Sequence, residues 1–88
     1  MALYEAIDSL PEGSRLKYKS AAGTTIVYEP VLRGAGRLDV IVRKQSNNAT
    51  SKPDETSHEY EGVEREWCDR QEDVLRGLGI DPSDYTVI

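Results

Sequence analysis

The chain has 88 residues, of which 16 are acidic and 11 basic, and a formal net charge of −5. A chain of this length builds one modest core and leaves little material for a deep, enclosed active site. It contains no apolar run near the roughly 20 residues that cross a bilayer, and its first residues lack the layout of a signal peptide. With Cys68 as the only cysteine, no disulfide forms within the chain. We therefore expect one soluble, cytoplasmic domain without membrane contact.

The charge is unevenly placed along the chain. Residues 1–45 carry seven bases and five acids, whereas residues 46–88 carry four bases and eleven acids. Acid-rich, solvated surfaces keep a protein dissolved where salt screens charge, so this composition would suit a halophilic host. The contrast between the two halves predicts a basic surface in the first half and an acidic one in the second.

The first half of the chain predicts a short helix followed by three strands. Apolar residues at helical spacing predict a helix over residues 2–10, which Pro11 and Gly13 end. Residues 14–20, 24–32 and 37–44 alternate in the manner of half-buried strands. Short turns that contain Gly23 and Gly34–Gly36 join them into an antiparallel meander. Because Pro30 cannot donate to a ladder, it marks an edge, a bulge or a strand end.

The second half predicts a loop and a long helix. Residues 45–58 are polar throughout, which indicates a solvated, flexible loop. An apolar stripe predicts a helix from about residue 59 to residue 78, with Gly79 at its C′ position and Ile80 making the contact of a Schellman cap. Residues 85–88 are compatible with a final short strand.

Residues that could carry catalysis or bind a metal are sparse. The sole histidine, His58, lies at the edge of the polar loop, and Cys68 lies beside the apolar stripe of the long helix. One histidine and one cysteine cannot supply a zinc site, and the dense acids of residues 59–73 match no calcium-binding loop. We expect these acids to form a solvated helix face. The sequence therefore predicts no enzyme activity, no cofactor and no metal.

The segment Arg33-Gly34-Ala35-Gly36-Arg37 resembles a phosphate-binding loop only in its glycines. Such loops cradle phosphate at a helix N-terminus, whereas this segment joins two expected strands. A hairpin turn is the better account of it.

One face of the expected sheet is basic. The bases that share this face are Arg15, Lys17, Lys19, Arg37 and Arg43. Such a surface could follow a phosphate backbone, although Asp39 and Glu29 interrupt it. Tyr18 and Tyr28 are the aromatic residues nearby that would stack on bases. The alternative is that this face pairs with the acidic helix, in the same chain or in a neighbouring one.

The long helix offers a second candidate surface. Trp and Tyr are favoured anchors at interfaces, and the stripe contains Tyr60, Val63 and Trp67. The alternative is that the stripe covers the inner face of the sheet, which needs an apolar partner in any case. In a domain this small, part of the stripe could remain for contact with a second copy.

These patterns predict an α+β domain in the order α-β-β-β-α, with a three- or four-stranded antiparallel sheet on one long C-terminal helix. A small β-barrel with attached helices is the alternative fold. The predicted function is that of a non-catalytic protein-interaction or self-associating module, with itself or another protein as partner. A regulatory nucleic-acid-binding protein that uses the basic face is the alternative. An enzyme subunit would need residues from a second chain.

Overall fold

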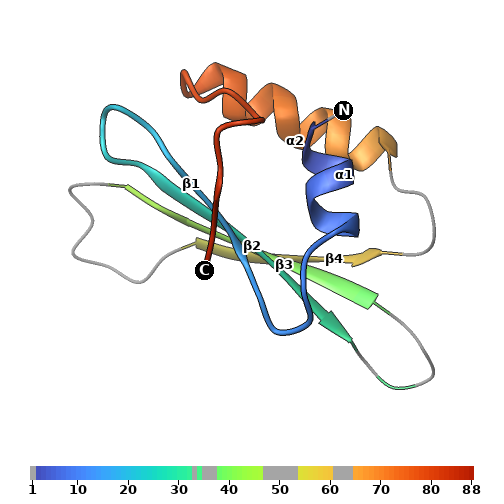
Figure 1. The fold of residues 1–88 in the computed structure, drawn as a ribbon. Helices are drawn as coiled ribbons and strands as arrows, with labels where there is room; N and C mark the ends of the chain where they lie inside the picture. Colours follow the sequence, from blue (N-terminus) through green and yellow to red (C-terminus); the bar gives the residue numbers. More distant parts are fainter. Residues whose placement is uncertain (1, 33, 35–37, 47–53, 61–64) are drawn as a thin grey trace.

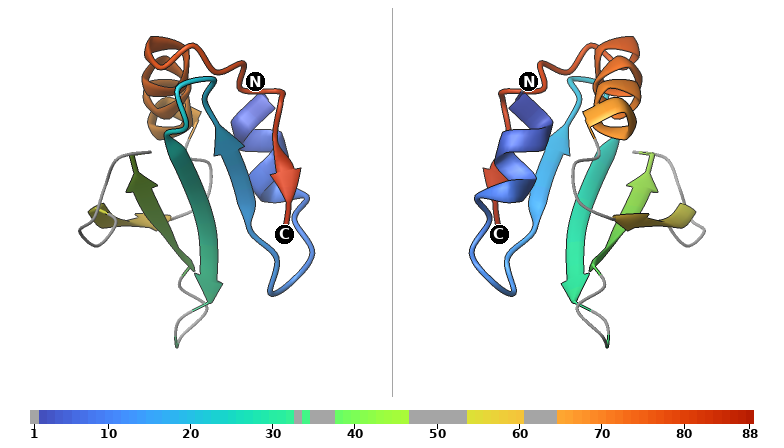
Figure 2. Two further views of the ribbon diagram at one scale, coloured as in Figure 1. Left: turned by 90° about the vertical axis from the view of Figure 1, so that its left-hand side faces the viewer. Right: turned by 90° about the vertical axis from the view of Figure 1, so that its right-hand side faces the viewer.

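A computed structural model of the chain describes residues 2–32, 34, 38–46, 54–60 and 65–88. Its elements in chain order are α1 (Ala2–Asp8), β1 (Leu16–Lys19), β2 (Thr25–Leu32), β3 (Leu38–Gln45), β4 (Asp54–Tyr60), α2 (Arg65–Gly77) and β5 (Thr86–Val87). The strands form one antiparallel sheet in the order β4-β3-β2-β1-β5. Both helices lie on one side of this strongly twisted sheet (Figures 1 and 2). The predicted α+β fold is therefore confirmed, and the final short strand is present.

The core lies between the inner face of the sheet and the two helices. Alternate residues of β1 and β2 point into it, as strand geometry requires. The buried apolar residues are Leu3, Ala6, Ile7, Leu16, Tyr18, Ile26, Tyr28, Val40, Trp67, Cys68, Leu75 and Ile80. The opposite, outer face of the sheet carries Lys17, Val27 and Arg43, which lie in one row across β1, β2 and β3.

Two glycines adopt the positive φ that their predicted positions require. Gly23 has φ 93° in the turn between β1 and β2. Gly79 has φ 75° after α2, where the N–H of Ile80 donates to the carbonyl of Leu75 and the N–H of Gly79 donates to that of Arg76, both at 2.9 Å. These two bonds and the buried side chain of Ile80 form the predicted Schellman cap.

The boundaries of β4 and α2 differ from the sequence prediction. Residues 54–58 of the predicted loop begin β4, and α2 starts at Arg65 rather than near residue 59. β4 pairs with β3 from Lys44↔Asp54 to Leu38↔Tyr60. Residues 54–58 are polar at successive positions, so they carry no alternating signal, and the backbone hydrogen bonds to β3 that define the strand do not depend on side-chain type. Residues 47–53 of the predicted loop lie outside the described residues. Pro30 lies in the part of β2 that extends beyond its pairing with β1, with Val31 and Leu32 still in the strand, so it occupies an edge position rather than a strand end.

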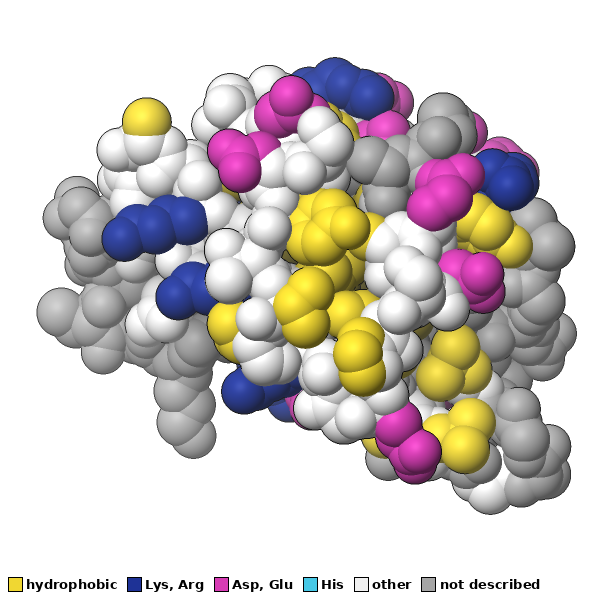
Figure 3. Space-filling model, in the orientation of Figure 1, with side chains coloured by type: hydrophobic (Ala, Val, Ile, Leu, Met, Phe, Trp, Pro, Cys, Tyr) yellow, Lys and Arg dark blue, Asp and Glu magenta, His cyan; other side chains and the backbone are white. Residues whose placement is uncertain are grey.

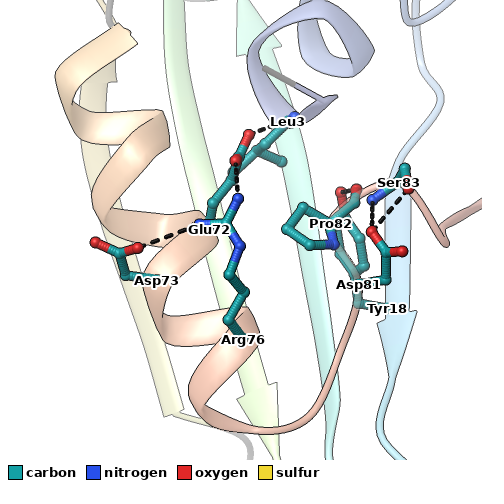
Figure 4. Close-up of polar contacts among 8 residues, drawn as sticks. All are labelled: Leu3, Tyr18, Glu72, Asp73, Arg76, Asp81, Pro82 and Ser83. Carbon is teal, nitrogen blue, oxygen red and sulfur yellow. Dashed lines mark hydrogen bonds and ion pairs between the residues drawn. The ribbon is translucent and has the colours of Figure 1, made fainter.

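A buried carboxylate joins the two helices. The Glu72 side chain is 2% exposed, accepts a hydrogen bond from the backbone N–H of Leu3 at 3.0 Å and pairs with Arg76 at 2.9 Å (Figure 4). The N–H groups of the first helical turn have no partner within a helix, so a carboxylate there satisfies a donor and opposes the helix dipole. A helix as short as α1 is not stable alone in water. This contact with α2 therefore helps to hold α1 in place.

A row of aromatic rings crosses the inner face. Tyr85 lies against Tyr18, Tyr18 against Tyr28, and Tyr28 against Trp67, with centroid separations of 6.1, 5.9 and 6.3 Å. His58 of β4 stacks on Trp67 at 4.6 Å. The Tyr18 hydroxyl donates to the carbonyl of Pro82 at 2.6 Å (Figure 4), which ties the segment before β5 to the core.

Candidate interaction surface

The basic residues in β1 and directly before it project from the outer face of the sheet. Leu16 and Tyr18 are fully buried, so Arg15, Lys17 and Lys19 point the other way. Figure 3 shows basic side chains in a diagonal row where β1 runs. Within the described part of the chain, none of these three bases forms an ion pair, whereas Arg43, Arg65, Arg70 and Arg76 all do.

The predicted five-base surface is smaller than expected. Arg43 does share the outer face, but its guanidinium contacts Glu29 at 2.6 Å and Glu55 at 2.9 Å. Hydrogen bonds to these two carboxylates raise the pKa of Arg43 above its usual range, and they neutralise its charge locally. Arg37 lies outside the described residues. Arg15, Lys17 and Lys19 therefore make up the basic strand.

Tyr18 and Tyr28 are not available for stacking on nucleic-acid bases. Both rings are fully buried on the inner face. The Tyr28 hydroxyl donates to Gln71 Oε1 at 2.9 Å, and burial is the main cause that raises the pKa of each tyrosine. They are core residues because the side-chain alternation of β1 and β2 turns them toward the helices.

A groove runs between β1 and β5 on the outer face. It has a volume of about 370 Å³ and is lined by Lys17, Lys19, Asp84, Thr86 and Ile88. Asp84 is exposed and forms no ion pair with any residue that the structure describes. Asp84 thus lies beside the basic strand at one edge of the sheet, and neither forms an ion pair with a described residue.

The segment from Tyr85 to Ile88 forms that edge and is apolar. Tyr85, Val87 and Ile88 are 38%, 48% and 46% exposed, and β5 is the outermost strand beside β1 (Figure 2). The run Tyr-Thr-Val-Ile carries no charge and is rich in residues that favour strands. That signal was present in the sequence, but exposure at a sheet edge could not be read from it.

The backbone of β5 has an open side. Arg15 and Ile88 exchange two hydrogen bonds at 2.9 Å, so they form a hydrogen-bonded pair of the antiparallel ladder. In such a ladder these pairs alternate with non-hydrogen-bonded ones. Leu16↔Val87 is the next pair and Lys17↔Thr86 the one after. The N–H and C=O groups of Tyr85 and Val87 therefore point away from β1, toward the position of a further strand.

The other edge of the sheet has the opposite character. β4 carries exposed Asp54 and Glu55, and charged side chains on an edge strand discourage pairing with another chain. The two edges therefore differ in what they can accept: β4 is protected by charge, whereas β5 is not.

The structure does not place Tyr60, Val63 and Trp67 together on one described helix surface. Trp67 is only 8% exposed and packs between Tyr28 and His58. Tyr60 belongs to β4 rather than to the helix, and nothing is described of its side chain. Val63 lies outside the described residues. Trp67, the member whose side chain the structure describes, thus covers the sheet, whereas Val74, further along α2, is 45% exposed.

His58 and Cys68, the two candidates for catalysis, both lie in packed positions. Cys68 is fully buried in the core, and His58 stacks on the Trp67 indole. Among the residues that the structure describes, no three histidine, cysteine, aspartate or glutamate side chains group as metal ligands would. The same residues include no helix long and apolar enough to cross a membrane.

No family model, curated protein or solved structure matches this chain.

Proposed function

We propose that this chain is a non-catalytic protein-interaction module that self-associates through the β5 edge of its sheet. The observation that supports this most directly is the open, uncharged edge with Tyr85 and Val87 exposed. A strand that offers unpaired backbone groups and apolar side chains is a template for another strand. Natural sheets usually block such edges with charge, as β4 does here.

The expected association is weak to moderate. The edge is short, and each backbone hydrogen bond contributes only about 0.5–1.5 kcal/mol net. Association must also offset the loss of translational and rotational freedom. We therefore expect a dissociation constant in the range of about 1 μM to 1 mM, which corresponds to roughly 8 to 4 kcal/mol.

The first experiment is sedimentation velocity of the wild-type chain and of Val87→Lys over this concentration range. The wild type should shift toward dimer as concentration rises, whereas Val87→Lys should stay monomeric, because a lysine on the edge must be desolvated for a strand to pair there. Circular dichroism checks that the variant is folded.

Val74→Lys is the matched control. Val74 has nearly the same exposure, 45% against 48%, but it lies on α2 instead of the edge. It should associate like the wild type. A wild-type chain that remains monomeric up to about 1 mM, or equal loss of association in both variants, would contradict the proposal.

A second candidate function is nucleic-acid binding by the basic strand. It is favoured by three bases that form no ion pair with any described residue, in a chain whose net charge is −5. The absence of stacking from Tyr18 and Tyr28 leaves phosphate contacts as the main source of affinity, so binding would be strongly salt-dependent and insensitive to sequence.

Fluorescence anisotropy with labelled single-stranded oligonucleotides at several salt concentrations tests this candidate. Three phosphate contacts predict a slope of about −2 for log K against log salt. The triple variant Arg15→Glu, Lys17→Glu, Lys19→Glu should lose binding. Lys44→Glu should keep it, because Lys44 is another exposed base that pairs with no acid in the described parts of the chain. Binding that survives the triple variant would place the contact elsewhere.

A further inference from the structure

We propose that two copies of the chain pair β5 with β5 antiparallel, around a two-fold axis at Thr86, and that Asp84 of each copy meets Arg15 of the other. This inference rests on the proposed function, because it specifies the partner and the register at the same edge. Its two parts, the backbone register and the charge pairing, follow from separate observations.

The register follows from the direction of the backbone groups. Tyr85 and Val87 direct their N–H and C=O groups outward, and Thr86 directs its groups to β1. An axis at Thr86 places Tyr85 of each copy opposite Val87 of the other as a hydrogen-bonded pair. Thr86 then faces its own counterpart as a non-hydrogen-bonded pair.

This register also gives favourable side-chain pairs. Val87 pairs with buried Leu16, and Tyr85 contacts the Tyr18 ring, so both side chains lie toward the inner face. In the dimer each tyrosine lies beside the valine of the second copy, and the two threonines meet on the outer face. Aromatic pairs with β-branched residues, and threonine pairs, are among the combinations that stabilise antiparallel strands.

The charge pairing follows from the rows of the extended sheet. In each copy Arg15 pairs with Ile88. The two-fold axis at Thr86 places Ile88 of the second copy opposite Asp84, so Arg15 of that copy lies two strand spacings from Asp84, about 10 Å between backbones. An arginine side chain can cross Ile88 along its aliphatic stem. Asp84 and Arg15, each without an ion pair in the described chain, become partners.

The occupant of the edge is a second copy rather than the β4 edge of another molecule. Pairing of β5 with β4 would be head-to-tail and would generate rings or open chains of molecules, whereas β5 with β5 is isologous and closes as a dimer. The acids of β4 do not favour pairing with β5 of another copy, because Glu55 already forms an ion pair with Arg43.

Cysteine cross-linking tests the register. With the axis at Thr86, the two copies of residue 86 lie about 4.5 Å apart between Cα atoms, within the range of a disulfide. Under mild oxidation Thr86→Cys should form covalent dimers at least tenfold faster than Val87→Cys, whose two copies lie about 8 Å apart. Ser57→Cys, exposed on the β4 edge, is the matched control and should cross-link as slowly. Cys68 is fully buried and does not compete.

Charge exchange tests the ion pair. Arg15→Asp and Asp84→Arg each place like charges together in their own homodimers, and each should weaken association about three- to tenfold. A 1:1 mixture should recover association to within about twofold of the wild type, because both contacts in the mixed dimer then join opposite charges.

The outcomes separate this inference from the proposed function. Fast cross-linking of Thr86→Cys and recovery in the mixture would support it. If the wild type associates and Val87→Lys abolishes association, but Val87→Cys cross-links fastest or the mixture fails to recover, the edge is correct and this register or ion pair is wrong. A monomeric wild type would overturn both.

Discussion

Replacing Trp67 with alanine should destabilise the chain by about 3–5 kcal/mol, the usual cost of removing a large buried aromatic side chain. The indole is 8% exposed, stacks on His58 at 4.6 Å and meets the edge of Tyr28 at 6.3 Å. Small domains are stable by only about 5–15 kcal/mol, so this loss removes much of the total. It should lower the melting temperature by at least about 12 °C.

Urea denaturation followed by circular dichroism measures this effect. Val74→Ala on the same helix is the control; its side chain is 45% exposed, and we expect a change of less than about 0.5 kcal/mol. A loss below about 1 kcal/mol for Trp67→Ala would mean that the indole is not a core residue, and the placement of α2 on the sheet would be wrong.

Stability should fall steeply above about pH 10, the ordinary pKa of tyrosine. Burial raises the pKa of Tyr18 and Tyr28, so both keep their protons in the folded state where the unfolded chain has lost them. The unfolded state then binds fewer protons, and the free energy of unfolding decreases as pH rises, by up to about 2.7 kcal/mol per pH unit for the two groups together. Below about pH 10 they contribute no pH dependence.

The double variant Tyr18→Phe, Tyr28→Phe identifies the source of this effect. It loses two hydrogen bonds, to Pro82 and Gln71, and so should be somewhat less stable at neutral pH. Its free energy of unfolding should nevertheless depend much less on pH above about pH 10. Equal alkaline slopes for the variant and the wild type would show that these tyrosines do not titrate as buried groups.

The difference between the two sheet edges connects the fold to the proposed function. A chain of 88 residues buries a limited fraction of its surface, and both helices pack on the inner face of the sheet. The outer face and the β5 edge are therefore left to solvent or to a partner. The C-terminal segment is held in place by the hydrogen bond between Tyr18 and Pro82, so the edge is presented by an ordered part of the chain.

Local sequence patterns determined much of the architecture. Alternation predicted β1 to β3, because one face of each strand is buried and successive side chains point to opposite faces. Gly23 and Gly79 marked the turn and the helix cap, since a positive φ strongly favours glycine. The basic face of Arg15, Lys17 and Lys19 also followed from alternation alone.

Only the tertiary structure decided the rest. β4 has no apolar alternation because residues 54–58 are polar at successive positions, so the sequence predicts a loop there and places Tyr60 on a helix. The sequence places Arg43 on the basic face but does not show its ion pairs with Glu29 and Glu55, because these contacts join residues far apart in the sequence. Tyr85 and Val87 became a candidate interface only once strand order placed them at an open edge. Pairing, burial and exposure are properties of the assembled sheet, which periodicity within one segment does not encode.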